Sequence, residues 1–145
     1  MPNKISKPIY VLGTGLSHDG SACLLKDGEV CVAIEKERIT RQKHDGYSDN
    51  EALLYCLESE GIGWDDIDLV VQNANFSNFS RGNKVFHGVE RIIPETVRIE
   101  TISHHLAHAY SVVGTCPYDE IAILVADGCG SSFDDCTDLS GGTVA

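Results

Sequence analysis

The sequence predicts an α/β protein in which helices pack on the faces of a mixed β-sheet. Strand patterns occupy residues 9–35, a helix pattern follows them, and strand and helix patterns alternate further along the 145-residue chain. Apolar residues recur at every second position in half-buried strands and at helical spacing in amphipathic helices. This order of elements favours a mixed sheet that carries helices on its faces.

The N-terminal segment predicts three strands, at residues 9–13, 22–25 and 30–35. Asp27 and Gly28 lie between the second and the third strand, and an Asp-Gly pair is a strong signal for a tight hairpin. We therefore expect those two strands to pair with each other.

A helix is expected after these strands, with an apolar face that covers the sheet. Ser48 and Glu51 have the spacing of a capping box, and Gly61 suits the residue that ends a helix. Between them, one face of the predicted helix carries Leu53, Leu54 and Leu57. The charged residues at 35–38 and 41–45 precede this helix and are typical of a solvated edge.

The second half of the chain continues the alternation. Residues 68–72 and 97–102 predict strands, and residues 104–113 predict a helix. The unbroken apolar run at 121–126 predicts a central strand covered on both faces. The polar stretch at 73–85 predicts a long loop, tethered by its aromatic residues Phe76, Phe79 and Phe86.

Composition restricts the classes of partner. The chain is 42% hydrophobic and 23% charged, as globular proteins are, and its net charge of −11 disfavours nucleic acid and anionic lipid. It lacks an apolar run of the ~20 residues that a membrane helix needs. Its six cysteines form no CxxC pair, which favours reduced, structural thiols. We expect a cytoplasmic protein that binds neither nucleic acid nor membranes.

Two histidines predict a metal site. His104 and His108 are one helical turn apart, so that both imidazoles can reach one ion. Asp127 follows the predicted central strand and can supply a third ligand, which suits iron, zinc or manganese. The alternative is a solvated helix face with an unrelated aspartate.

Two further segments carry candidate residues. His18 lies in the turn between the first two predicted strands and can act as a general base or hold a phosphate. Alternatively, this turn has only a structural role, since Asp19 and Gly20 are common turn residues. Lys43 and Arg41 can meet an anion, although charge there is also typical of a solvated surface. His44 and His87 look isolated and are expected on the surface.

The two ends of the chain share a pattern. Residues 11–21 and 125–132 each combine a predicted buried strand with a short turn containing Gly, Asp and Ser. Two such turns face each other across the phosphate-binding cleft of duplicated sugar-kinase and actin-type ATPases, where backbone amides hold anions.

Six ordered segments together resemble the N-terminal part of the nodulation-type O-carbamoyltransferases, a family that modifies antibiotics and lipo-oligosaccharides. The segments are Ser17-His18-Asp19-Gly20-Ser21-Ala22, Leu25-Lys26-Asp27-Gly28, the charged stretch from Glu35 to Asp45, Leu54-Tyr55-Cys56-Leu57, His104-His105-Leu106-Ala107-His108-Ala109 and Asp127-Gly128. Any one of them is a weak signal, whereas their common order across nearly the whole chain is specific.

This resemblance implies a ribonuclease-H-like, actin-type ATPase fold, with residues 1–118 as its first half and residues 119–145 as an incomplete second half. In the family, a separate adenylate-forming domain, which we expect this chain to lack, uses ATP and carbamoyl phosphate to make carbamoyl adenylate. The domain that this chain resembles then passes the carbamoyl group to an acceptor hydroxyl.

The resemblance also implies roles for individual residues. His104, His108 and Asp127 correspond to ligands of a divalent metal, with iron favoured, and His18 to a catalytic histidine. Lys43 corresponds to a residue that binds the anionic donor. Gly128, Gly130 and Ser131 fall where the second phosphate-binding turn would lie.

The leading interpretation is therefore a truncated O-carbamoyltransferase that acts on a sugar or antibiotic hydroxyl, and the isolated chain is expected to be inactive. One alternative is a non-catalytic assembly module that associates through an exposed sheet edge. Another is a small-molecule kinase of the same fold class.

Overall fold

The computed structural model describes residues 7–15, 19–46, 48–74, 85–86 and 89–126. The chain divides into two units, Met1–Gln72 with Lys84–Glu100, and Asn73–Asn83 with Thr101–Ala145. In chain order the elements are β1 (Tyr10–Gly15), β2 (Ser21–Lys26), β3 (Glu29–Glu35), α1 (Lys36–Thr40), α2 (Asn50–Glu60), the 3-10 helix η1 (Trp64–Asp66), β4 (Ile67–Ala74), β5 (Val85–Phe86), β6 (Val89–Glu90), β7 (Ile99–Ser103) and α3 (His104–Thr115).

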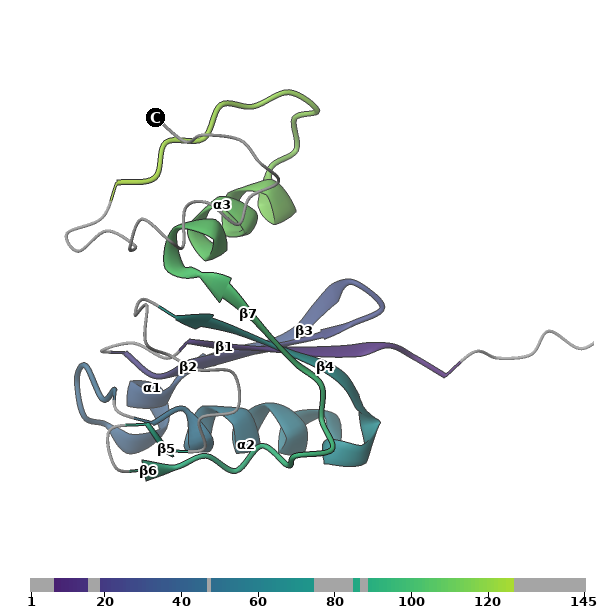
Figure 1. The fold of residues 1–145 in the computed structure, drawn as a ribbon, viewed down its shortest axis with the longest axis vertical. Helices are drawn as coiled ribbons and strands as arrows, with labels where there is room; N and C mark the ends of the chain where they lie inside the picture. The colour runs from purple at the N-terminus through teal and green to yellow at the C-terminus, as the bar shows by residue number, and fades with distance from the viewer. Residues whose placement is uncertain (1–6, 16–18, 47, 75–84, 87–88, 127–145) are drawn as a thin grey trace, which may run out of the picture. The chain divides into compact units, whose positions relative to one another are not determined.

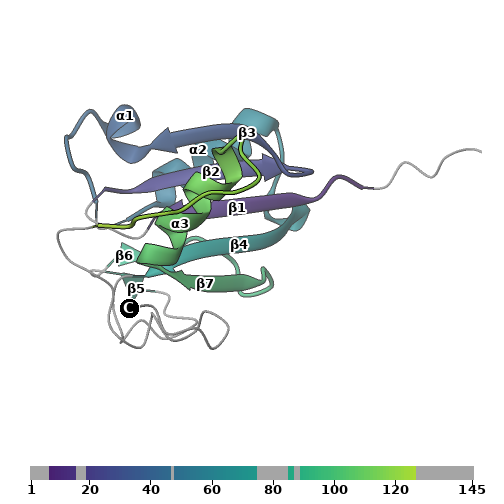
Figure 2. The same cartoon turned by 90° about the horizontal axis from the view of Figure 1, so that it is seen from above.

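A five-stranded sheet organises these elements (Figure 1), and its strand order β3-β2-β1-β4-β7 is seen in Figure 2. β5 and β6 form a separate two-stranded sheet. The α/β class with a mixed sheet is therefore confirmed, and β4 and β7 correspond to the strands predicted at 68–72 and 97–102. No helix in the described ranges combines the length and the apolar character needed to cross a bilayer.

The first three strands form an antiparallel meander. Leu12 of β1 lies opposite Leu24 of β2, and Lys26 of β2 lies opposite Glu29 of β3. Asp27 and Gly28 connect β2 to β3 with φ angles of 52° and 88°. Positive φ at both central residues is the backbone of a tight hairpin turn, so that the predicted hairpin is confirmed.

The core lies between this meander and α2. Leu12 and Leu24 from the sheet and Leu53 and Cys56 from α2 are fully buried. α2 packs on β2 and β3, and Figures 1 and 2 show it running along one face of the sheet. Burial of these apolar side chains supplies the main driving force for folding of this unit.

The predicted face and start of α2 need correction. The helix begins at Asn50 after the cap residue Asp49, while the Ser48 hydroxyl accepts the Asn50 N–H at 3.2 Å. Leu54 is 43% exposed instead of facing the core. The buried face consists of Ala52, Leu53, Cys56 and Leu57. Gly61 ends the helix at φ 66°, as expected, because a left-handed backbone favours glycine.

The charged residues after β3 do not form a simple solvated edge. Residues 36–40 form α1, whose first residue, Lys36, is only 6% exposed, and residues 41–45 form the following loop. The Lys36 ammonium lies 3.0 Å from Asp45 Oδ1 and 3.5 Å from Glu51 Oε2, and donates to the Gly46 carbonyl at 3.3 Å. The buried cation is therefore paired and hydrogen-bonded, which offsets the cost of removing it from water.

The strand predicted at residues 121–126 is wrong. The segment has no regular secondary structure, and Leu124 is 91% exposed. An apolar run becomes a central strand only where neighbouring strands and both covering layers are present, and no described strand pairs with it. In the predicted loop at 73–85, β4 continues to Ala74, whereas residues 75–84 and the side chain of Phe86 lie outside the described part.

A buried polar network connects four parts of the first unit. Asp49 and Arg91 form an ion pair with a 3.0 Å Oδ2–Nη2 distance, and their side chains are 1% and 7% exposed. Arg91 also donates to Gln72 Oε1 at 2.6 Å, and the Thr14 hydroxyl donates to Asp49 Oδ2. The network thereby links β1, the start of α2, β4 and the segment after β6.

Replacing Arg91 by Met should destabilise the chain by about 3–5 kcal/mol, because the Asp49 carboxylate stays buried without its counterion. Urea unfolding at neutral pH measures this loss. Adding Asp49→Asn should recover part of it. Arg98→Met, which breaks an exposed ion pair with Glu100, is the control and should cost no more than about 1 kcal/mol. Equal costs for Arg91→Met and Arg98→Met would contradict the assigned role.

The described cysteines should differ in reactivity. Burial raises the pKa of the Cys56 thiol to about 11, and proximity to Cys23 adds to the shift, whereas Cys31 is exposed. Since the thiolate is the reactive form, iodoacetamide at pH 8 should alkylate Cys31 in the folded chain and spare Cys56 until urea is added. Peptide mass spectrometry provides the measurement, and rapid native labelling of Cys56 would show that its burial is incorrect.

Candidate functional site

The two histidines of α3 face each other. Ser103 caps the helix by accepting the Leu106 N–H at 3.1 Å, so that His104 is the first helical residue. Its Nε2 lies 3.1 Å from Nε2 of His108, and the rings meet edge to face with centroids 4.6 Å apart. The predicted convergence of these two imidazoles is confirmed.

This geometry fits two ligands of one metal ion. Two nitrogens bound at about 2.0–2.1 Å lie about 3.4 Å apart at a tetrahedral angle and about 2.9 Å apart at a right angle. The observed 3.1 Å falls between these values. Without a metal, the same distance suits a hydrogen bond from the N–H of one ring to the other ring, so that an ion would take the place of that proton.

Asn73 supports the pair from β4. Its side-chain nitrogen lies 3.4 Å from Nδ1 of His104. A half-turn of the amide presents the oxygen to an Nδ1–H instead, and such a contact to the outer ring nitrogen is what orients metal-bound histidines. His104, His108 and Asn73 all belong to the second unit.

His108 also borders a groove of about 200 Å³ within the second unit. The other lining residues are Ser111, Val112, Ile123, Leu124, Val125 and Ala126. His108 is thus accessible to small molecules from this groove.

The loop after α1 carries two unpaired cations. Lys43 and Arg41 are exposed, and within the described ranges they are the lysine and arginine that take part in no ion pair. Two residues of this loop adopt a left-handed backbone conformation, and they lie on either side of Lys43 in the sequence: Arg41 at φ 62° and His44 at φ 55°. In a chain of net charge −11, this loop is a place where an anion can bind.

The turn before β2 is fastened to this loop. Gly20 donates its N–H to the Asp45 carbonyl at 3.1 Å and accepts the Lys36 N–H at 2.7 Å. A Cβ at Gly20 would lie 2.5 Å from the Ser48 carbonyl oxygen, so that the approach requires glycine. The structure therefore brings the turn that follows His18 in the sequence against the loop that carries Lys43.

His44 is not isolated, contrary to the prediction. Its Nδ1 lies 2.9 Å from Asp19 Oδ1, and its backbone N–H donates to Glu37 Oε2 at 3.2 Å. The ligand-type atoms of Asp19, Glu37 and His44 all lie within 4.8 Å of one another. Sequence analysis could not predict this cluster, because its members come from three segments and no local sequence spacing indicates a contact between residues 19 and 44.

The remaining predicted site residues are not described. His18, Asp127, Gly128, Gly130, Ser131 and His87 lie outside the described residues. Lys43 belongs to the first unit, while His104 and His108 belong to the second.

Comparison with known proteins adds a family. Residues 10–84 match the family described as "Carbamoyltransferase N-terminus". The chain is 30% identical over 149 aligned residues to nodulation protein NolNO of Sinorhizobium fredii, covering 88% of this chain and 22% of that protein. It is 27% identical over 157 aligned residues to the uncharacterised protein sll1178 of Synechocystis, covering 83% and 26% respectively.

These matches point to a family of transferases. More specifically, the chain belongs to the carbamoyltransferase N-terminal family, as its six sequence segments indicated. It spans about a quarter of the length of these two relatives.

Acid should weaken the fastening of the loop. The pKa of Asp45 is lowered, first by a hydrogen bond from Thr40 and then by Lys36. A lowered folded-state pKa stabilises the fold above the unfolded pKa of about 3.9, and the stabilisation is lost as the pH falls below that value. Asp45→Asn should therefore be less stable than wild type at pH 6, with a smaller difference at pH 3.

Urea unfolding at the two pH values measures this difference. Thr40→Val is the matched variant, because it removes the largest cause of the shift and should reduce the same acid-dependent component. A difference between wild type and Asp45→Asn that does not change with pH would contradict the assignment.

Proposed function

We propose that this chain is the carbamoyl-transfer part of an O-carbamoyltransferase, which moves a carbamoyl group from carbamoyl phosphate, via carbamoyl adenylate, to an acceptor hydroxyl. The observation that carries the proposal is the convergence of His104 and His108 in a chain of the carbamoyltransferase N-terminal family. The strand order, with an antiparallel meander at one side, supports a ribonuclease-H-like fold of the actin and sugar-kinase type.

His104, His108 and Asp127 would hold a divalent metal. Two imidazoles and a carboxylate suit iron, which we favour, and also zinc or manganese. The bound ion would neutralise phosphate charge and polarise the carbonyl.

The chain's other residues would handle the donor and the proton. Lys43 would bind the anionic donor, and Gly128, Gly130 and Ser131 would contribute backbone amides to its phosphate. His18 would remove the acceptor's hydroxyl proton. The oxygen then forms a bond to the carbamoyl carbon while the bond to the phosphate oxygen breaks, and AMP leaves with that electron pair.

The acceptor is proposed to be a small molecule, such as a sugar or antibiotic hydroxyl. A net charge of −11 disfavours a polyanionic acceptor such as tRNA. ATP would be a substrate of the longer protein, and the present chain would be inactive by itself. The free cysteines of the described residues fit a reducing, cytoplasmic location.

A secondary role in self-association has one supporting observation. β3 is an edge strand of the five-stranded sheet, and Val30 on it is 64% exposed. An exposed edge with apolar side chains can pair with another strand. Such pairing is compatible with the transferase role.

The metal prediction can be tested on this chain. His108→Ala should weaken binding of Fe²⁺ or Zn²⁺ by about tenfold or more, because one imidazole cannot replace two. Competition with a chelator of known affinity, followed by metal analysis, gives the comparison. Ser111→Ala, about one helical turn after His108 in α3, is the control and should bind the metal as tightly as wild type. Equal metal binding by wild type and His108→Ala would refute the metal site.

A further inference from the structure

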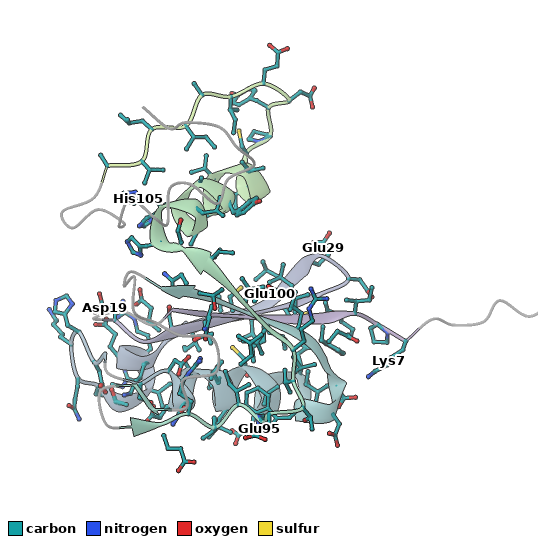
Figure 3. All side chains as sticks on the ribbon, in the orientation of Figure 1. Lys7, Asp19, Glu29, Glu95, Glu100 and His105 are labelled. Atoms are coloured by element: carbon teal, nitrogen blue, oxygen red, sulfur yellow. The ribbon has the colours of Figure 1, made fainter. Side chains whose placement is uncertain are left out.

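Three side chains join the turn before β2, helix α1 and the following loop. We call Asp19, Glu37 and His44 the clasp. The imidazole of His44 contacts the Asp19 carboxylate at 2.9 Å, and the His44 backbone N–H donates to Glu37 at 3.2 Å. Figure 3 labels Asp19 at the end of the sheet where this turn lies. The clasp closes over the surface of the junction between turn and loop.

The junction also has contacts of its own beneath the clasp. Beneath it, Gly20 exchanges backbone hydrogen bonds with Lys36 and Asp45, and the Lys36 ammonium is buried against Asp45. The His44 and Asp19 side chains are 77% and 38% exposed. Exposed ion pairs contribute little to stability, so that loss of the clasp should leave the free energy of unfolding almost unchanged.

The clasp acts on the residue beside it. Lys43 directly precedes His44 and makes no ion pair with any described residue. The carboxylates of Asp19 and Glu37 lie nearby, since both contact His44. The Asp19 carboxylate contacts the His44 imidazole, and the Glu37 carboxylate accepts the His44 backbone N–H and also pairs with Arg38 at 3.4 Å. This arrangement fixes the backbone at residue 44 and keeps the Lys43 ammonium available for an external anion.

We propose that the clasp is a positioning device that holds Lys43 for the anionic carbamoyl donor. This inference rests on the proposed function, which assigns donor binding to Lys43. Asp19, Glu37 and His44 do not touch the donor themselves. They act through Lys43, so that their loss should weaken anion binding without a matching loss of stability.

The test measures binding of AMP, which carries the phosphate of the proposed carbamoyl adenylate donor, and of inorganic phosphate, to this chain by NMR titration, together with the melting temperature. Lys43→Ala should lose binding. His44→Ala and Asp19→Ala should each bind about three- to tenfold more weakly while melting within a few degrees of wild type. His44→Asn should restore binding, because its amide can donate to Asp19 and asparagine tolerates positive φ. Gln42→Ala, in the same loop, is the control and should bind as wild type.

The outcomes separate the two claims. Weak binding by Lys43→Ala with unchanged binding by His44→Ala and Asp19→Ala overturns the clasp alone. Loss of melting temperature in step with binding, without rescue by His44→Asn, also overturns it, because the cluster would then be structural. Wild-type binding by Lys43→Ala overturns the donor role of Lys43 and therefore both claims. A wild-type chain that binds neither probe does the same.

Discussion

The first unit depends on two opposite charges held out of water. The ion pair of Asp49 and Arg91 is almost completely buried, and Thr14 and Gln72 each add one hydrogen bond to it. A charge in such a place is tolerated only while its partner is present. The pair therefore fixes the start of α2 and the segment after β6 relative to β1 and β4, all within the same unit.

A second buried cation, Lys36, is likewise paired with carboxylates, and it lies beside an exposed loop that carries candidate ligand-binding residues. Lys36 is enclosed by Asp45, Glu51 and a backbone carbonyl, and it brings the loop after α1 against the turn at Gly20. The buried contacts of Lys36 and Gly20 hold this loop in place, and the exposed side chains of the loop are therefore available for ligands. Arg41 and Lys43 lie in this exposed position.

Local signals predicted much of the fold. The Asp27-Gly28 pair, the helical glycine Gly61 and the period of the strands all depend on near neighbours, and the structure confirms each of them. The same holds for His104 and His108, since a helix brings residues four apart together without tertiary contacts. Long-range contacts were not predictable in this way.

The failures have a common physical cause. Nothing near Lys36 in the sequence shows that Asp45 and Glu51 will enclose it, nor that Asp19 will meet His44. Leu54 points outward because α2 is oriented by the strands beneath it and not by its own leucines. The run at 121–126 has strand composition, yet a strand is defined by pairing, which composition cannot supply.

The two left-handed residues on either side of Lys43 bear on how tightly any ligand of that lysine is held. Arg41 and His44 adopt a backbone that non-glycine residues seldom visit, at φ 62° and 55°. Conformational entropy that the loop loses when the chain folds does not have to be lost again when a ligand binds. An anion arriving at Lys43 meets a preorganised loop, and the entropic penalty of capture is confined largely to the lysine side chain itself.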